Sequence, residues 1–249
     1  MTEEVGQNAG PPADMTLPRH VVSFVRRGSR MTDSQRHWLH RHGPRYLLDV
    51  QRSDRVTAIP PQPPLDLERV FGRRADLVVE IGSGHGETLA HAAARHPETD
   101  FLGFEVFDAG LASTVGALAA AGLDNVRLVA GDGVQGLAHL LGPASCAELW
   151  VYFPDPWHKA RHHKRRLVSP AFVTLAASRL RPGGLLRLAT DWPDYADWIE
   201  QTLAGRPEFA RRDLGRPADR PLTKYEARGL AQGRSIRDFT WVRRGGSDD

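Results

Sequence analysis

The chain has 249 residues, of which 41% are hydrophobic and 25% charged, so we expect one soluble α/β domain with short extensions. No run approaches the roughly 18 consecutive apolar residues of a membrane span, and the polar, acidic start lacks the features of a secretory signal, so we expect a cytoplasmic protein without membrane contacts. The only cysteine, Cys146, excludes an intramolecular disulfide, and with the histidines scattered or in basic runs we expect no metal site.

The first third of the chain divides by composition. Residues 1–18 are rich in Gly, Pro, Ala and acids, which predicts a disordered tail. Residues 19–52 hold eight arginines against two aspartates, and we expect a short helix near Asp33–Arg41. Four prolines in residues 58–66 predict an extended connector. We therefore expect a basic extension and connector over 19–66 and the main folded domain over 67–245.

From Asp76 onward, the pattern alternates strand with helix. Strands are expected at Leu77–Ile81, Asp100–Glu105, Asn125–Val129, Glu148–Phe153 and Gly184–Thr190. Helices are expected at Glu87–His96, Asp108–Ala121, Val134–Leu141, Ser169–Leu180 and near Tyr195–Leu203. Two later strands, Glu208–Asp213 and Phe239–Arg243, would close the sheet. This order predicts an α/β fold with a mostly parallel seven-stranded sheet and helices on both faces, in which ligands bind beyond the carboxyl ends of the strands.

A glycine loop follows the first of these strands. It reads E-I-G-S-G-H-G from Glu80, with glycines at Gly82, Gly84 and Gly86. Glu87 occupies the place of the third glycine in the dinucleotide fingerprint, which argues against a nicotinamide site. An acidic residue followed by G-x-G-x-G instead resembles the Rossmann-like class I methyltransferases. That resemblance implies S-adenosyl-L-methionine as the methyl donor and S-adenosyl-L-homocysteine as the product.

Three carboxylates at strand ends suit this donor chemically. Glu80 would suit the cationic methionine end, which has no pyrophosphate for a helix N-terminus to bind. Glu105 can accept hydrogen bonds from both ribose hydroxyls, and Asp132 can accept one from the adenine amino group. The alternative is that all three are ordinary residues of strand-end turns.

The fourth strand runs into Y-F-P-D-P-W-H-K-A-R-H-H-K-R-R, residues 152–166. Two prolines stiffen the turn and hold Asp155 at the mouth of the site. Trp157 would stack on a base or pack in the core, and both interpretations stay open. Residues 158–166 carry five fixed positive charges and no acid, which indicates an anionic partner unless the run is only a solvated surface.

The string P-D-P-W-H-K-x-R-H-x-K-R-R resembles the signature of the bacterial tRNA (guanine(46)-N7)-methyltransferases. The resemblance extends to S-F-V-R-R-G-S-R at 23–30, G-F-E-V at 103–106, A-T-D-W at 189–192 and T-K-Y-E at 223–226, and covers roughly residues 20–243. Family members often have T-K-F-E at the last motif. Tyr225 adds only a hydroxyl to that phenylalanine, so the implied role should survive.

The resemblance implies methyl transfer to N7 of guanine 46 in the variable loop of tRNA, with tRNA as the partner and the enzyme a monomer or a homodimer. It implies that Asp155 is the catalytic carboxylate, and that the cofactor is bound by Glu80, Gly82, Gly84, Gly86, Glu105, Asp132 and Asp155. It implies substrate contacts from Lys159, Asp191, Thr223, Lys224, Tyr225 and Glu226. It implies RNA contacts from Arg161, His162, His163, Lys164, Arg165 and Arg166.

N7 of guanine carries a lone pair and no proton, so no general base is needed at this atom. We therefore expect Asp155 to orient guanine and to offset the positive charge that grows on the ring. Asp191 would bind the guanine edge in the same way, and Lys159 would donate to O6 or to a phosphate. The alternatives are that Asp155 only caps a turn and that Asp191 is the N-cap of the next helix.

Three other functions are weighed against this one. The first is a class I methyltransferase that acts on a small molecule or a protein. The basic run at 158–166 argues against a small neutral substrate. A non-enzymatic RNA-binding protein is disfavoured by the intact acidic set of Glu80, Glu105, Asp132 and Asp155. A nicotinamide oxidoreductase is disfavoured by Glu87.

Overall fold

The computed structural model describes residues 31–53 and 57–245, so the predicted tail over 1–18 and the basic motif at 23–30 lie outside the described residues. A single seven-stranded sheet has the order β3-β2-β1-β4-β5-β7-β6. Neighbouring strands from β3 to β5 pair in parallel, and β7 is antiparallel to both of its neighbours. The strands are β1 (Leu77–Ile81), β2 (Asp100–Glu105), β3 (Val126–Ala130), β4 (Cys146–Tyr152), β5 (Leu180–Thr190), β6 (Phe209–Arg212) and β7 (Arg237–Arg243). The predicted mostly parallel sheet is confirmed.

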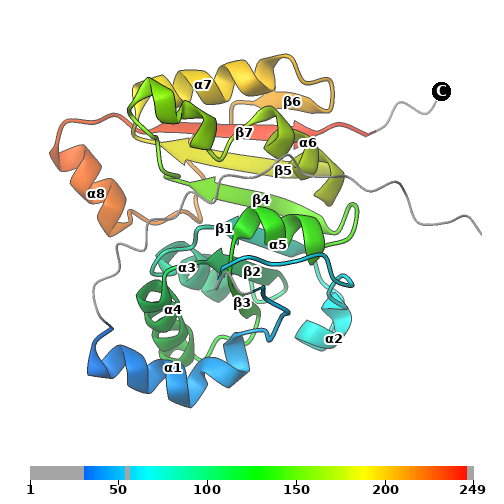
Figure 1. The fold of residues 1–249 in the computed structure, drawn as a ribbon, viewed down its shortest axis with the longest axis vertical. Helices are drawn as coiled ribbons and strands as arrows, with labels where there is room; N and C mark the ends of the chain where they lie inside the picture. Colours follow the sequence, from blue (N-terminus) through cyan, green and yellow to red (C-terminus); the bar gives the residue numbers. More distant parts are fainter. Residues whose placement is uncertain (1–30, 54–56, 246–249) are drawn as a thin grey trace, which may run out of the picture.

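Helices cover both faces of this sheet (Figure 1). One core contains α5 (Gly133–His139), α6 (Pro170–Arg179) and α7 (Pro193–Ala204), and the other contains α3 (Glu87–Arg95) and α4 (Asp108–Ala121). Alternate strand residues enter the two cores: Val79 lies in the first and Val78 in the second. This follows from the twofold side-chain period of a strand. Both faces are covered, so β1 and β2 are buried along their full length, including the acidic residues Glu80, Asp100 and Glu105.

Helix α1 (Asp33–Tyr46) packs outside α4 and ties the basic extension to the domain. Thr32 and Gln35 form a capping box at its N-terminus. The Gln35 amide also donates to the Ala109 carbonyl (3.1 Å) and to Ser113 Oγ (2.9 Å). The start of α1 therefore lies against the first turn of α4, near the carboxyl end of β2. Pro44 does not end the helix, which is longer than the predicted Asp33–Arg41.

Three short helices were not predicted: α2 (Leu67–Phe71), the 3-10 helix η1 (Ala160–Arg165) and α8 (Lys224–Ala231). The arrowheads of β4 and β5 in Figure 1 point toward the edge where α8 lies. Ser169 is the N-cap of α6 and Pro170 its first residue. Cys146 is fully buried. None of the described helices is long and apolar enough to cross a membrane.

Candidate active site

The glycine loop lies at the carboxyl end of β1. Gly82, Gly84 and Gly86 have φ values of +77°, +58° and +74°, a left-handed conformation that other residues adopt only under strain. A Cβ on Gly82 or Gly84 would meet no atom within 4 Å, whereas one on Gly86 would lie 2.3 Å from Thr114 Cγ2. The last glycine is thus required by packing, and the first two leave open space in which a ligand can lie against the backbone.

Glu105 fixes the shape of this loop from the end of β2. Its Oε2 accepts from the amide of Gly84 (2.6 Å), and its Oε1 accepts from the amides of Val106 (2.7 Å) and Phe107 (2.9 Å). Burial raises the pKa of Glu105, and these backbone hydrogen bonds act against that rise. Each carboxylate oxygen has two lone pairs, so the group keeps acceptor capacity for a ribose hydroxyl.

Glu80 is the buried carboxyl beneath the loop. It is 3% exposed, and its Oε2 has no hydrogen-bond partner among the described residues. Burial, and then the charge of Glu105, raise its pKa to about 8. A buried carboxyl of this kind is stabilised in its charged form by a cationic ligand. The ammonium group of S-adenosyl-L-methionine has the required charge, so the residues present fit this donor.

Asp132 follows β3 and is fully buried. It is the N-cap of α5, where its Oδ1 accepts from the amides of Val134 (2.9 Å) and Gln135 (3.1 Å). This cap fixes the start of α5 at the site edge of the sheet. The expected contact of Asp132 with adenine stays a prediction.

The loop after β4 holds Asp155 on a strained backbone. The Phe153 amide donates to the Ala189 carbonyl of β5 (2.8 Å). Phe153 and Trp157 have φ values of +51° and +49°, and strain of this kind costs about 1–3 kcal/mol per residue. Asp155 lies exposed between them. Burial raises the pKa of Tyr195 above its usual range and the charge of Asp155 adds to the rise, so Asp155 lies near the first turns of α7.

Trp157 packs within this loop rather than in the core. Its ring is half-buried, with the ring of His162 at 5.7 Å in an edge-on arrangement and the guanidinium of Arg165 at 5.0 Å. The interpretation of Trp157 as a core aromatic is therefore wrong.

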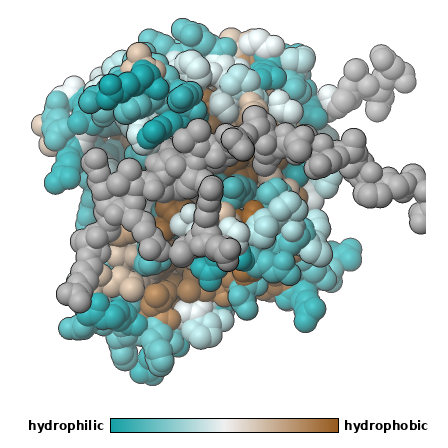
Figure 2. All heavy atoms as spheres, viewed as in Figure 1, coloured by the Kyte–Doolittle hydropathy of each residue, from teal (hydrophilic) through white to brown (hydrophobic). Residues whose placement is uncertain are grey.

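The basic segment forms η1, and Lys159 is its N-cap. Lys159, Arg161 and Lys164 are exposed. Loss of hydration, and then the charges of neighbouring cations such as Arg165, lower the pKa of His162. Figure 2 shows strongly hydrophilic side chains gathered where Figure 1 places this segment. The segment is thus a positively charged surface beside the loop that carries Asp155.

Arg166 differs from its neighbours, and its burial argues against the expected RNA contact, which stays a prediction. It is 3% exposed, its Nε donates to the Pro156 carbonyl (3.0 Å), and its guanidinium pairs with Asp194. A side chain enclosed in this way is poorly placed to reach a phosphate.

Asp191 follows β5 and does not cap the next helix. The N-cap of α7 is Trp192, whose amide donates to Thr190 Oγ1 (3.2 Å). Asp191 instead pairs with Arg234 (2.7 Å). Arg234 belongs to none of the sequence motifs, so its place beside Asp191 was not predicted. Helix α8 passes so close that a Cβ on Gly229 would lie 2.9 Å from Asp191 Oδ2.

The T-K-Y-E motif begins α8 and lies beside the glycine loop. Thr223 is the N-cap and its hydroxyl accepts from the amide of Glu226 (3.3 Å). The Lys224 amide donates to Glu87 in the first turn of α3 (3.1 Å). Tyr225 is 75% exposed. Residues 223–225 are therefore accessible at the edge of the site.

Glu226 differs from the rest of this motif because it is buried, which argues against the expected substrate contact; that contact stays a prediction. It is 1% exposed and pairs with Arg216 and with Arg220 (2.9 Å). Arg220 also pairs with Asp238 of β7 (2.7 Å) and lies over the rings of Tyr152 and Phe153. Glu226 thus anchors α8 to the ends of β4 and β7. Arg220 lies between Pro217 and Pro221 in the sequence, and no motif there predicted this cluster.

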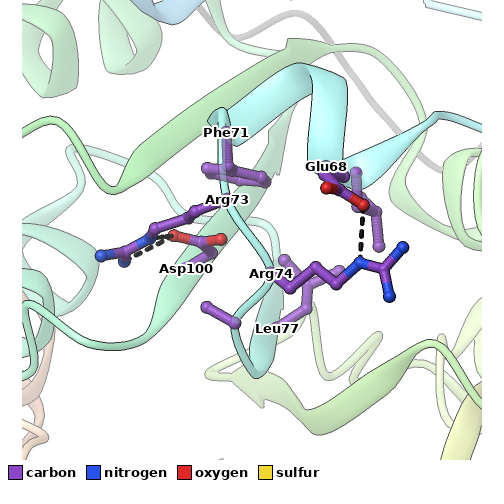
Figure 3. Close-up of a pocket in the computed structure, with 8 residues that line it drawn as sticks. Glu68, Phe71, Arg73, Arg74, Leu77 and Asp100 are labelled. Atoms are coloured by element: carbon purple, nitrogen blue, oxygen red, sulfur yellow. Dashed lines mark hydrogen bonds and ion pairs between the residues drawn. The ribbon is translucent and has the colours of Figure 1, made fainter.

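The cavity in Figure 3 lies at the other end of the sheet. It is lined by residues around the start of β1 and β2, among them Phe71 and Leu77, and Arg73 pairs with Asp100 there (2.7 Å). None of the predicted site residues lines it. Within residues 31–53 and 57–245, no group of three His, Cys, Asp or Glu side chains is arranged to hold a metal ion.

Comparisons with known proteins identify relatives over most of the chain. A family model described as "Putative methyltransferase" matches residues 74–239. The tRNA (guanine-N(7)-)-methyltransferase of Cutibacterium acnes is 50% identical over 231 residues, which cover 90% of this chain and 84% of that protein. The protein of the same name from a Nocardioides species is 45% identical over 233 residues, covering 94% and 91% of the two chains.

Solved structures of RNA methyltransferases share the fold. The 16S rRNA methyltransferase KamB has a TM-score of 0.52 at 19% identity and covers 77% of this chain and 99% of its own. The 16S rRNA (adenine(1408)-N(1))-methyltransferase of Catenulisporales acidiphilia, solved with its cosubstrate SAM, has a TM-score of 0.52 at 16% identity, covering 78% and 97%. These likenesses confirm the class I Rossmann-like methyltransferase fold.

Proposed function

Because this chain belongs to the tRNA (guanine-N7)-methyltransferase family, we propose that its target is guanine 46 in the variable loop of tRNA. The enzyme transfers a methyl group from S-adenosyl-L-methionine to N7 of guanine in tRNA. The choice of position 46 is supported by the resemblance of residues 154–166 to the family signature. We also propose that the reaction takes place in the cytoplasm and that the enzyme acts as a monomer or a homodimer.

The donor would be held by the carboxyl ends of β1 to β4. The observation that carries this proposal is the Glu80 Oε2, which is buried without a hydrogen-bond partner among the described residues, at the end of the strand that leads into two glycines with open space around them. Glu80 would bind the ammonium group, and Gly82, Gly84 and Gly86 would follow the donor backbone. Glu105 would accept from the ribose hydroxyls, Asp132 from the adenine amino group, and Asp155 would approach the methyl-bearing end.

Guanine would enter between the loop after β4 and α8. When bound, the donor supplies a methyl group on a positively charged sulfur. Asp155, at the apex of its strained loop, accepts from the N–H groups of guanine and keeps N7 directed at that methyl group. Its negative charge offsets the positive charge that the ring gains, and no residue needs to remove a proton from N7.

Substrate contacts would also come from the facing elements. Asp191 accepts from the guanine edge while Arg234 holds its other side. Lys159 donates to O6 or to a phosphate, and Thr223, Lys224 and Tyr225 contact the target nucleotide from the start of α8. Because Asp191 and α8 lie in contact, these groups would close on the nucleotide together.

The tRNA backbone would be held by η1 and the residues next to it. The cations and polar groups available to phosphates are Lys159, Arg161, His162, His163, Lys164 and Arg165. Phosphate contacts position the RNA without reading its sequence, and their strength falls as salt rises.

Methyl transfer to two tRNA transcripts that differ only at nucleotide 46 tests this proposal. The wild-type enzyme should label the transcript with guanine 46 and leave the transcript with adenine 46 unlabelled. Equal labelling of the two would refute the assignment of the position, and labelling of neither would refute tRNA methylation itself.

A further inference from the structure

The guanidinium of Arg166 lies buried where the loop after β4 meets α7. Its Nε donates to the Pro156 carbonyl (3.0 Å), one residue beyond Asp155. Its Nη2 pairs with Asp194 in the first turn of α7 and lies 3.0 Å from His163 Nε2. The Arg166 side chain is 1% exposed, whereas its partner Asp194 is 60% exposed, so the guanidinium is enclosed and the carboxylate faces solvent.

The α7 side of this contact is rigid. The guanidinium lies 5.0 Å from the ring centre of Tyr195, which is fully buried, and 5.5 Å from that of Trp198. Both rings are themselves fixed by Val168, because the Tyr195 hydroxyl accepts from its amide (3.1 Å) and the Trp198 indole donates to its carbonyl (2.6 Å). Arg166 therefore joins the loop to a part of the fold that cannot easily move.

The loop needs such an anchor. Phe153 and Trp157, on either side of Asp155, both have positive φ values without being glycine. A conformation of this kind persists only when surrounding contacts hold it, because it would otherwise relax to a less strained one. The hydrogen bond from Phe153 to Ala189 holds one side of the loop, and the bond from Arg166 to Pro156 holds the other.

We propose that Arg166 is a positioning residue that holds Asp155 where guanine is methylated, rather than one of the RNA-binding cations beside it. This inference rests on the proposed function, because it assigns Arg166 a task in that reaction. The planar guanidinium donates to Pro156 and Asp194 at once while lying against two aromatic rings. A lysine ammonium cannot satisfy all four contacts, so Arg166→Lys keeps the charge and loses the anchor.

The test measures steady-state kinetics of tRNA methylation for Arg166→Lys in two backgrounds, wild type and Asp155→Asn. Arg206→Lys is the matched control, because Arg206 also donates to a proline carbonyl (Pro170, 3.0 Å) but lies at the end of α7 away from the site. We expect Arg166→Lys to lower kcat at least tenfold in the wild-type background and less than twofold in Asp155→Asn. The KM for tRNA and its dependence on salt should stay unchanged. Arg206→Lys should change kcat less than twofold.

A raised KM for tRNA with a weaker salt dependence would overturn the inference, since Arg166 would then be a phosphate contact. An unchanged kcat, or an equal loss in both backgrounds, would also overturn it, because Arg166 would not act through Asp155. Hydrogen exchange supplies a readout without activity: the peptide over 153–166 should exchange faster in Arg166→Lys and at the wild-type rate in Arg206→Lys. Equal exchange in the two variants would contradict the anchoring role.

If Arg166→Lys does not fold, Asp194→Asn replaces it, because Asp194 is 60% exposed and its loss weakens the same anchor from outside. It should lower kcat at least threefold with the KM for tRNA unchanged, and an unchanged kcat would overturn the inference. The wild-type reaction separates this inference from the proposed function. A wild-type enzyme that forms no 7-methylguanine would refute the function, whereas normal wild-type activity with an unaffected variant would refute only the role of Arg166.

Discussion

A carboxyl group that is buried without a hydrogen-bond partner holds its proton more tightly than one in water, and Glu80 is such a group. Its pKa of about 8 in the folded protein lies above its ordinary value of 4.5, so the folded state binds this proton more strongly than the unfolded state. The stability that this proton contributes is fully present below pH 4.5 and is lost as the pH rises through about 8.

Without the donor, the protein should therefore lose a few kcal/mol of unfolding free energy between pH 5 and about 8, because each pKa unit corresponds to about 1.4 kcal/mol. Glu80→Gln should flatten this part of the profile and weaken donor binding at least tenfold. Urea unfolding at a series of pH values, with calorimetric titration of the donor, measures both. The same slope in wild type and variant would show that Glu80 does not titrate in this range.

Asp155 is the residue on which methyl transfer is expected to depend. Asp155→Ala removes the acceptor and the charge together and should lower kcat by two orders of magnitude or more. Asp155→Asn keeps an acceptor oxygen without the charge and should fall between wild type and Asp155→Ala. Single-turnover rates with saturating tRNA measure the difference, and near-normal activity of Asp155→Ala would remove Asp155 from the reaction.

The sequence motifs predicted where candidate site residues lie in the fold better than they predicted which of those side chains are buried. Glu80, the glycine loop and Asp155 lie at the carboxyl end of the sheet because strand ends can be located from an apolar run and the turn after it. Arg166 and Glu226 look like their neighbours in the sequence, yet both are enclosed by residues that are distant in the chain, Asp194 and Arg220 among them. Burial of a charged side chain depends on such tertiary partners, so no local pattern revealed it.

Among the elements, η1 has the clearest expected effect on RNA binding. Arg161→Ala and Lys164→Ala each remove one exposed cation and should raise the KM for tRNA severalfold at moderate salt. Each should also reduce the slope of log affinity against log salt by about one, with donor affinity unchanged. Filter binding across a salt series measures the slopes. Slopes equal to that of wild type would show that η1 does not contact phosphates.

Helix α8 is held by a buried ion cluster. Glu226→Ala should destabilise it strongly, by about 3–5 kcal/mol, because Arg220 would remain buried with one of its two carboxylate partners, Asp238, left to balance its charge. Glu200→Ala is the matched control, since Glu200 also pairs with two arginines but at 30% exposure, where an ion pair contributes about 1 kcal/mol or less. Limited proteolysis of residues 213–235 and thermal unfolding compare the two. Equal stability of the variants would contradict the anchoring of α8.

The same cluster explains why α8 was not predicted. The strands from β1 to β5 carry apolar runs that end at turn residues, and helices α3 to α7 bury apolar side chains, so the bounds of these elements were predicted to within about four residues. In α8 only Glu226 and Gly229 are buried, and its stabilising contacts reach Arg216, Arg220 and Asp238 outside the helix. A helix without a buried apolar face cannot be located from an apolar pattern in its own sequence.

At the scale of the whole molecule, the parallel sheet brings together residues that are far apart in the chain. Glu80 and Glu105 lie at the ends of β1 and β2, and Asp155 and Asp191 follow β4 and β5. The sheet order places β1 between β2 and β4, with β5 next to β4. Because parallel strands end at one edge, the proposed donor and guanine sites share that edge. The alternation of strand and helix in the sequence predicted this arrangement. The packing of α8 against Asp191 was not predicted, because it depends on contacts between residues that are distant in the chain.

Formation of 7-methylguanine at guanine 46 of tRNA can be measured by nucleoside analysis and fragment mapping by mass spectrometry, after reaction of unmodified tRNA with S-adenosyl-L-methionine and the purified enzyme. We expect one 7-methylguanine per tRNA, located in the fragment that contains guanine 46, and at most about a hundredth of the wild-type rate of its formation with Asp155→Ala. Methylation at another atom of guanine, at another position, or in no tRNA fragment would contradict this expectation.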